Sequence, residues 1–401
     1  MPSVGVRLIS AGKAAPIMAS TAVRLLGARI LSGLVVGIAA DGPPVERWAI
    51  DAMPRLESIF GGHPLPTDES ERAGRRALEI ADALRHDEAL VVLLSGGASA
   101  LLAVPAAGLC VDDKRTATEE LLRAGADITA LNAVRKHLSA IKGGRLAARA
   151  KGDCRTFAVS DVVGDDLSVI ASGPTVADAT TFSDALDVVR QYSRSASFPP
   201  GVVAHLERGA RGELPETPKP GDARLRRSRS KVVGGRRDAM DGAAREARAR
   251  GYHVLWVEDP VVGEARVAAV AHLRGALARV ADQPRPMCVV SSGETTVRVE
   301  GRGRGGRNQE FALALAAPLA LLGVPAAAAS VGTDGIDGPT PAAGALVDWT
   351  TLRRAAAAGI GEPSRFLNDN DAYRFHAAVG DLVQTGPTGT NVGDLQIVLL
   401  A

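Results

Sequence analysis

A nine-residue segment rich in glycine and arginine is the first candidate for chemistry in this sequence. Residues 301–309 read Gly-Arg-Gly-Arg-Gly-Gly-Arg-Asn-Gln, between a strand-like run at 295–300 and an Ala/Leu run at 311–322. Glycine lets the backbone approach a ligand, and the arginine guanidinium suits phosphate or carboxylate. Two interpretations are open. The spacing of Gly301, Gly303 and Gly306 matches the G-x-G-x-x-G of a dinucleotide site, and a glycine loop before a helix can also be another kind of phosphate clamp.

Two other glycine loops follow strand-like runs near the start of the chain. In the first, Lys13 follows Gly12 and can reach a phosphate as a point charge, although Ala14 stands where a Walker A loop has Ser or Thr. The second runs from Ser95 through Gly96, Gly97 and Ala98 to Ser99 and could hold phosphate on its amides, with Ser99 at a helix N-cap. A hydrolase would use Ser99 as a nucleophile, but the second glycine of G-x-S-x-G is missing.

Carboxylates lie directly after the strand-like run at 156–160. Asp161 and Asp165 suit magnesium binding or base catalysis, although acids in a turn can also be ordinary caps. Gly173 and Thr175 follow shortly and add groups that could bind phosphate. Asp334 lies in a glycine-rich turn at 332–338, where it could bind a metal ion or a sugar hydroxyl.

A basic run at 132–145 is predicted to be helical. Asn132, Arg135 and Ser139 would share one face, opposite a buried stripe of Val134, Leu138 and Ile141. Arg135 and Lys142 could bind an anion, or the basic side chains could simply be solvated. His137 is expected to be structural.

The elements that position these loops alternate between strands and helices. Strands are predicted at 5–10, 33–38, 89–94 and 156–160, with a helix at 14–26. Such alternation indicates a parallel sheet with helices on both faces, whose ligands bind beyond the carboxyl ends of the strands. The loops are therefore expected to converge on one crevice.

A Pro/Arg/Glu-rich stretch at 214–230 is the best domain boundary. A strand restarts at 231–235, followed by a helix at 238–250, a strand at 253–257 and a hairpin of 287–291 with 295–300. We therefore expect a Rossmann-like α/β domain over residues 1–225 and a second α/β domain over residues 226–401.

Composition narrows the partners. The net charge of +2 argues against nucleic acid or an anionic membrane, and the three cysteines match no metal or redox spacing. The uncharged stretch 311–332 is long enough to span a bilayer, but its two prolines and many alanines favour a buried helix, a turn and a buried strand. With no signal peptide expected, we predict a cytoplasmic protein.

Long strings across nearly the whole chain resemble the class II glycerate kinases, the glycerate 2-kinase family whose C-terminal part is called MOFRL. The strings that carry this resemblance are Gly12-Lys13-Ala14-Ala15, Gly61-Gly62-His63-Pro64, Ser95-Gly96-Gly97, Asn132-x-Val134-Arg135-Lys136-His137-Leu138-Ser139, Lys142-Gly143-Gly144-Arg145, Ser160-Asp161, Gly164-Asp165-Asp166, Ser172-Gly173-Pro174-Thr175, Gly293-Glu294-Thr295-Thr296, Gly305-Gly306-Arg307-Asn308-Gln309-Glu310, Thr333-Asp334-Gly335-Ile336-Asp337-Gly338 and Asn391-Val392-Gly393-Asp394. The sequence departs from the family at Ala98 and Ser292, where glycine is usual, and it begins almost directly at the first strand.

The resemblance implies phosphate transfer from ATP to the 2-hydroxyl of D-glycerate with magnesium, in a cleft between the two domains. By matching position, Lys13 and Arg307 are the catalytic candidates. Both would stabilise charge on the transferred group and meet on closure. Replacing Arg307 with alanine is expected to cut turnover and leave the fold intact.

Other roles follow by weighing the remaining loops. Asp161 would accept the hydroxyl proton, and Asp165 and Asp334 would bind magnesium. The expected nucleotide-binding residues are Ser95, Gly96, Gly97, Ser99, Gly173 and Thr175, and the expected substrate-binding residues are Arg135, Lys142 and His63. The partners would be D-glycerate and a nucleotide, without nucleic acid or membrane, and a homodimer is left open.

Two other classes compete. An NAD(P)H-dependent hydroxypyruvate reductase, a name that the same family often carries, would use the 301/303/306 glycines. However, a dinucleotide site wants an acid about 20 residues further on, and residues 311–332 contain none. A non-enzymatic sugar- or nucleotide-binding regulator would not explain why the sequence has both the lysine of the Gly-Lys loop and the paired acids after the 156–160 strand.

Overall fold

The structure is a computed structural model that describes residues 4–38 and 55–401. The chain divides into two compact units, Met1–Val233 and Gly234–Ala401. Each unit contains its own sheet with helices against it, so the predicted α/β class is confirmed.

The first unit is built on a six-stranded sheet in the order β3-β2-β1-β4-β5-β6. Neighbours from β3 through β5 run parallel, as expected. The strands are β1 (Gly5–Ala11), β2 (Ile30–Ile38), β3 (Leu56–Gly61), β4 (Glu88–Leu94), β5 (Asp153–Val159) and β6 (Ser228–Gly234). The division falls later than 225/226 because β6, which we expected to open the second domain, completes the first sheet.

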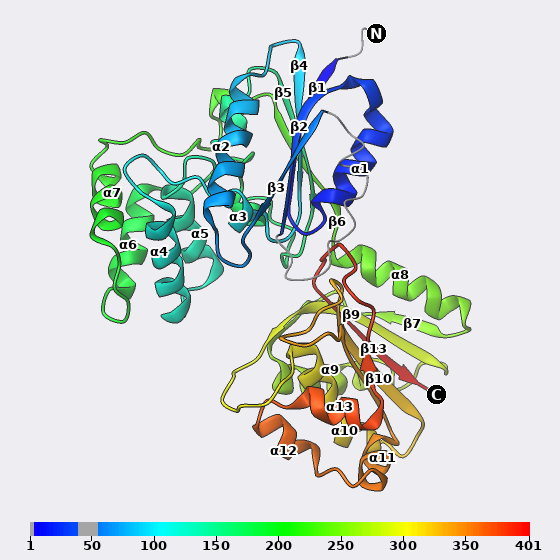
Figure 1. Cartoon of the computed structure of the whole chain (residues 1–401). Helices are drawn as coiled ribbons and strands as arrows, with labels where there is room; N and C mark the ends of the chain where they lie inside the picture. Colours follow the sequence, from blue (N-terminus) through cyan, green and yellow to red (C-terminus); the bar gives the residue numbers. More distant parts are fainter. Residues whose placement is uncertain (1–3, 39–54) are drawn as a thin grey trace. The chain divides into compact units, whose positions relative to one another are not determined.

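Both faces of this sheet are apolar and covered, which explains the continuous hydrophobic runs of its strands. Helix α1 (Ala15–Leu26) packs on the face that carries Leu8 and Val35. Helix α2 (Asp68–Asp82) packs with Ile9 and Leu34 on the opposite face, and Figure 1 shows the two helices on either side of the sheet. The short elements of this unit are α3 (Ala98–Leu101), η1 (Gly27–Arg29), η2 (Ala147–Arg149), η3 (Ile170–Ser172) and η4 (Ala223–Leu225).

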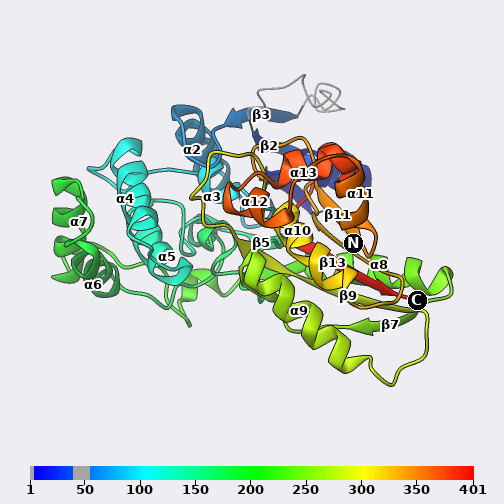
Figure 2. The ribbon, with the colours of Figure 1, turned by 90° about the horizontal axis from the view of Figure 1, so that it is seen from below.

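Four helices form a separate group in the first unit, which the sequence analysis did not predict. They are α4 (Val111–Arg123), α5 (Ile128–His137), α6 (Phe182–Tyr192) and α7 (Pro200–Ala210). They share a core around the fully buried Phe182, whose ring contacts His137 and His205, and they lie together in both views (Figures 1 and 2). The helix expected at 132–145 ends at His137, so Ser139 and Lys142 lie in the turns that follow it.

The second unit contains a sheet in the order β12-β11-β10-β13-β9-β7, with β8 beside β9. Its strands are β7 (His253–Trp256), β8 (Val261–Glu264), β9 (Met287–Thr296), β10 (Ala326–Gly332), β11 (Gly344–Asp348), β12 (Leu382–Val383) and β13 (Asp394–Leu400). The hairpin expected at 287–300 is wrong. Residues 287–296 form one continuous strand, because β9 pairs with β13 and β8 at Gly293 instead of turning there.

Helices cover both faces of this second sheet. Helices α9 (Ala265–Arg279) and α10 (Arg307–Ala320) share one core with the sheet, and α8 (Arg236–Ala249) packs on the other face. Three short helices pack against α10, and these are α11 (Thr351–Ala357), α12 (Pro363–Asn368) and α13 (Ala372–Val379). The uncharged stretch 311–332 forms most of α10, a turn and β10, as predicted, and no helix in the described part of the chain could cross a membrane.

Candidate active site

The glycine loops after β1 and β4 are locked together at the carboxyl edge of the first sheet. The Lys13 amide donates to the Gly96 carbonyl at 2.8 Å, and the Ala14 amide donates to Ser95 Oγ at 3.0 Å. Gly12 has a φ of 124°, and a Cβ there would lie 2.2 Å from Ser95 Oγ. This close approach requires glycine and holds Lys13 beside the second loop.

The two glycines of the second loop offer donors to a ligand. Within the described residues, the amides of Gly96 and Gly97 donate to no protein acceptor. Ser95, in contrast, is buried and uses its hydroxyl to hold the Lys13 loop. The N-cap of α3 is Gly97 and not the expected Ser99, because the left-handed backbone of Gly97 already turns the chain into the helix.

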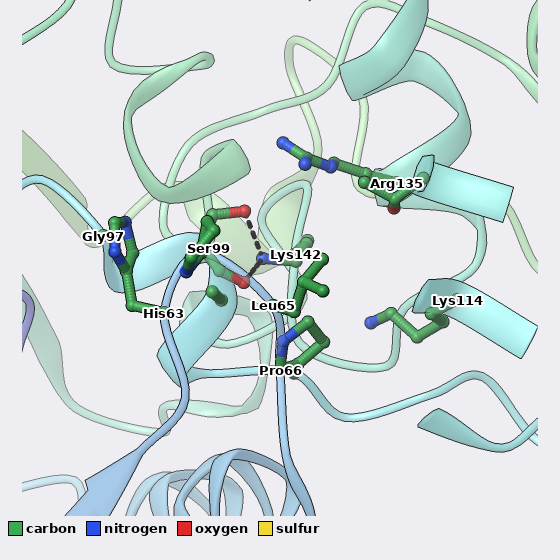
Figure 3. Close-up of a pocket in the computed structure, with 12 residues that line it drawn as sticks. His63, Leu65, Pro66, Gly97, Ser99, Lys114, Arg135 and Lys142 are labelled. Atoms are coloured by element: carbon green, nitrogen blue, oxygen red, sulfur yellow. Dashed lines mark hydrogen bonds between the residues drawn. The ribbon is translucent and has the colours of Figure 1, made fainter. Parts of the chain in front are cut away.

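A cavity of about 240 Å³ opens beside this loop (Figure 3). Its walls come from the β3–α2 loop, the start of α3, and helices α4 and α5 with the turn after α5. The residues that line it are His63, Pro64, Leu65, Pro66, Gly97, Ser99, Ala100, Ala103, Lys114, Thr118, Arg135 and Lys142. Of the segments expected to converge on one crevice, the loop at 95–99 and the basic run at 132–145 line this cavity.

Three cationic side chains face the cavity, and no carboxylate is among its described lining residues. Lys114 is 6% exposed and Lys142 is 3% exposed. Burial, with a smaller contribution from the Arg135 charge, lowers the pKa of Lys114 to about 7, and burial alone lowers the pKa of Arg135 to about 10. Burial also lowers the pKa of Lys142 well below its ordinary value, helped by the charges of Lys114 and Arg135. Uncompensated buried charge of one sign is the physical signature of an anion site.

The three cations differ in how many of their donors are already used. Lys142 Nζ donates to the Ser99 carbonyl at 2.7 Å and to Ser99 Oγ at 2.9 Å, as the dashed lines in Figure 3 show. Lys114 Nζ donates to the Val104 carbonyl at 3.1 Å and to no other residue within 4–38 and 55–401. The Arg135 guanidinium has no hydrogen bond or ion pair with any residue that the structure describes.

Lys142 is part of a hydrogen-bond network behind the cavity, next to two residues with strained backbone angles. Ser99 Oγ lies 3.0 Å from Ser172 Oγ, which donates to Asn132 Oδ1 at 2.8 Å. Ala171 and Ser172 both have positive φ angles, at 54° and 59°, which non-glycine residues rarely adopt. Such strain gathers where a site is held in shape. The basic run at 132–145 is therefore not a solvated face, because Lys136 and Lys142 are both buried.

The structure gathers five of the expected site residues, His63, Gly97, Ser99, Arg135 and Lys142, in one cavity. Residues expected to bind different ligands thus line the same cavity. Gly97 and Ser99 were expected to bind the nucleotide, and the other three were expected to bind the substrate. Lys114 was missed. A lone lysine in the charged pattern of α4 gives no sign that it is buried, so only the packing of α4 identifies it.

Gly173 and Thr175, which were expected to bind the nucleotide, make structural contacts within the protein. Thr175 is 2% exposed, and its hydroxyl accepts from Thr156 Oγ1 at 2.8 Å. Gly173 forms a tight left-handed turn in which a Cβ would lie 3.1 Å from the backbone of Ser168. We therefore leave both out of the proposed site.

Among the acidic residues after β5, Asp165 has an unusual backbone conformation and an unpaired carboxylate oxygen. Asp165 has a φ of 55°, and its Oδ1 is buried without a hydrogen-bond partner. No group of three or more His, Cys, Asp or Glu side chains that could hold a metal occurs among residues 4–38 and 55–401. Magnesium does not need such a group, since it keeps several waters and binds through one or two carboxylates plus phosphate oxygens.

In the second unit, Arg307 is the first residue of α10 and is firmly held. Its Nε and Nη2 donate to the two carboxylate oxygens of Asp394 at 2.7 and 3.0 Å, and Nη1 lies 2.9 Å from Glu294 Oε1. Burial lowers the pKa of the Arg307 guanidinium, but these carboxylates outweigh it and raise that pKa overall. Asp394 is fully buried, whereas Arg307 is 32% exposed. The structural partner Asp394 was not assigned from the sequence.

The amides that open α10 are already occupied. The Asp337 carboxylate accepts from the amides of Asn308 at 3.0 Å and Gln309 at 2.8 Å, so this helix N-terminus is not an open phosphate clamp. Gly301 and Gly303 serve packing. A Cβ at either would come within 2.3 Å of the segment Asp369–Asp371. The glycines of the G-x-G-x-x-G spacing therefore have structural contacts, which weakens the dinucleotide interpretation of this loop.

Asp334 lies in a turn held against the last loop of the chain. Asp334 Oδ1 accepts from the Ile336 amide at 3.1 Å, and Thr388 donates its hydroxyl to the Thr333 carbonyl at 2.6 Å. A Cβ on Gly335 would meet the Gly386 carbonyl oxygen at 2.0 Å. Two of the loops singled out in the sequence thus form one structural unit.

Family comparisons match both parts of the chain. Residues 3–207 match a model described as a domain of unknown function, DUF4147, and residues 287–394 match the MOFRL family. A glycerate 2-kinase of Pyrococcus horikoshii is 37% identical over 90% of this chain and 82% of its own length. A D-glycerate 2-kinase of Thermotoga maritima is 38% identical over 98% of this chain and 90% of its own length. The chain belongs to the class II glycerate kinase family.

Two more comparisons describe the breadth of this family. A crystal structure of glycerate kinase from Thermotoga maritima superposes with a TM-score of 0.85 at 36% identity, covering 99% of this chain and 92% of that one. A relative from Agrobacterium vitis, 40% identical over 98% of this chain and 86% of its own length, carries a provisional name as a hydroxypyruvate reductase. The fold is thus shared with a glycerate kinase, while the names in the family divide between two activities.

Proposed function

We propose that the protein transfers the γ-phosphate of ATP to the 2-hydroxyl of D-glycerate. The observation that carries this proposal is the small cavity lined by three cations, of which Lys114 and Lys142 are buried, with no carboxylate among its described lining residues. The chain is also 37% and 38% identical to two glycerate 2-kinases. A small hydroxy acid has the charge and size for such a cavity, which is smaller than the roughly 300–1,000 Å³ typical of larger ligands.

We assign the roles by element. The amides of Gly96 and Gly97 and the side chain of Lys13 bind nucleotide phosphates at the interlocked loops. Arg135 binds the substrate carboxylate, and Asp161 accepts the proton of the attacking hydroxyl. Arg307 stabilises negative charge on the transferred phosphoryl group, which is the main demand of this chemistry. Asp394 fixes the guanidinium through two parallel hydrogen bonds.

Magnesium fits the acids after β5. The unpartnered Oδ1 of Asp165 is the kind of oxygen that a hard cation prefers, and we propose Asp165 as a ligand, with Asp334 as a second candidate. When bound, the ion would neutralise phosphate charge. The protein would contribute the carboxylates of Asp165 and Asp334 as ligands and would position Lys13 beside the phosphates.

The test is a pair of assays on the intact protein. One incubates it with D-glycerate, MgCl₂ and ATP and follows ADP, and the other supplies hydroxypyruvate with NADH or NADPH. We expect ADP release that depends on glycerate, with 2-phosphoglycerate as the product isomer. Nucleotide oxidation without ADP formation would establish the reductase instead.

The reductase is the second candidate because a relative 40% identical carries that provisional name. The structure weakens its main support. The glycines that could form a dinucleotide loop pack against 369–371, and Asp337 occupies the helix amides. The kinase therefore remains the proposal.

A further inference from the structure

We propose that Lys114 is the residue that makes this enzyme specific for a carboxylate substrate, by binding one carboxylate oxygen while Arg135 binds the other. The inference rests on the proposed function and adds a residue that no comparison assigns. It makes the first turn of α4 part of the substrate site.

The position of Lys114 supports this role. It is buried and lines the cavity with Arg135 and Lys142. Figure 3 shows Lys114 directed toward Leu65 and Pro66 from one helix and Arg135 extending from another, with Leu65 and Lys142 between their charged ends in this view. No described residue forms a salt bridge with Lys114 or Arg135. A buried cation without a salt bridge costs free energy, so an anionic ligand that is absent from the free protein would explain a lysine at this position.

The count of unused donors separates Lys114 from Lys142. Lys142 donates twice to Ser99 and thereby fixes the start of α3, so it is a positioning residue. Lys114 donates to one carbonyl and has two further N–H groups, and Arg135 keeps its whole fork. Together they supply enough unused donors for both oxygens of a carboxylate, so that each oxygen can accept a charge-assisted hydrogen bond.

The shape of the cavity favours a carboxylate over the phosphates of the nucleotide. Leu65, Pro66 and Ala103 form an apolar wall beside the cations, which suits a small acid with a carbon skeleton. The phosphate donors proposed above, the amides of Gly96 and Gly97, belong to the loop that also holds Lys13.

The experiment compares wild-type protein with Lys114→Met, which keeps an unbranched side chain of similar length up to the ε-carbon and removes the charged nitrogen. Lys151→Met, at an exposed position of the same unit, is the matched control. Steady-state kinetics use D-glycerate and its neutral primary amide, each at saturating MgATP, and then vary ATP. Lys114→Met should raise KM for D-glycerate about 10- to 100-fold, as expected for a lost hydrogen bond to a charged group.

The other readouts distinguish binding from a structural role. KM for the amide and KM for ATP should change less than about threefold, since neither needs the Lys114 charge. Equal losses for acid and amide, or a loss confined to ATP, would overturn the proposal.

Calorimetric titration of both variants with D-glycerate alone keeps the test independent of turnover. If the wild type turns over no glycerate, the proposed function fails, and weaker glycerate binding by Lys114→Met than by wild type would still support the inference. Equal binding, or none to either, would overturn it.

Discussion

At the scale of single residues, the ion pair between Arg307 and Asp394 is expected to affect both stability and activity. Asp394 is fully buried and receives two hydrogen bonds from the guanidinium, so removing Arg307 leaves a buried carboxylate without its main partner. The expectation that Arg307→Ala leaves the fold intact therefore changes. Activity and stability must be measured together.

We predict that Arg307→Ala lowers turnover by about 10³-fold, since in the proposed mechanism it removes the cation that stabilises the transferred phosphoryl group. The same variant should lose on the order of 3 kcal/mol of unfolding free energy. Denaturant unfolding and kcat are the measurements. Adding Asp394→Asn should recover most of the stability and none of the turnover. Near-normal turnover in Arg307→Ala would remove Arg307 from the proposed mechanism.

The pKa of Lys114 predicts a pH dependence. The groups that act on it are the charges of Arg135, which lowers its pKa, and of Glu71, which raises it, while Lys142 faces the same cavity. Only the protonated amine attracts a carboxylate. With a pKa of about 7 in the free protein, kcat/KM for D-glycerate should be high below pH 7 and fall as pH rises through it.

To test whether Lys114 causes this decline, kcat/KM for D-glycerate is measured as a function of pH in Lys114→Met at saturating MgATP. The variant should have a lower kcat/KM and lack the decline above pH 7. A decline of the same size in the variant would assign the titration to another group.

At the scale of elements, one carboxylate holds the start of α10. Asp337 accepts from the amides of Asn308 and Gln309, and burial raises its pKa to about 6. Replacing Asp337 with alanine removes an N-terminal cap and leaves two buried amides unpaired. We predict a loss of about 2 kcal/mol in unfolding free energy, measured by denaturant titration at pH 7.5.

The matched control for this cap is Asp282→Ala, at an exposed position of the same unit. It should unfold within about 0.5 kcal/mol of wild type. If Asp337→Ala is equally harmless, α10 does not depend on this carboxylate, and its N-terminus becomes available again as an anion site.

At the scale of the whole molecule, two units with separate cores share the proposed chemistry. The cationic cavity and Lys13 belong to the first unit, and Arg307 belongs to the second. Each unit has its own sheet and hydrophobic clusters, so each is expected to fold by itself.

We predict that residues 1–233 and residues 234–401, produced separately, each unfold in a cooperative transition followed by circular dichroism. The first unit alone should still bind D-glycerate, because the whole cavity lies within it, but neither unit alone should release ADP. Full turnover by residues 1–233 would show that Arg307 has no part in the reaction.

Much of the fold and part of the site could be predicted from the sequence. The valine-rich runs and the glycines after them predicted the strands and loops of the first unit, because periodicity and left-handed turns are local properties. Gly97 and Ser99 lie in a loop after a predicted strand, where ligands of parallel sheets bind. Arg135 and Lys142 came from the basic run at 132–145 and His63 from the family resemblance, and the cavity contains all five residues.

What the sequence determined by itself was the α/β class, the order of the loops and the family. The tertiary structure alone decided which polar groups are satisfied. Asp394 lies 87 residues from Arg307, and Asp337 accepts from the amides of a helix 29 residues before it. Lys114 is buried without a salt bridge to any residue that the structure describes. Charge compensation depends on contacts between distant segments, so no local pattern could reveal it.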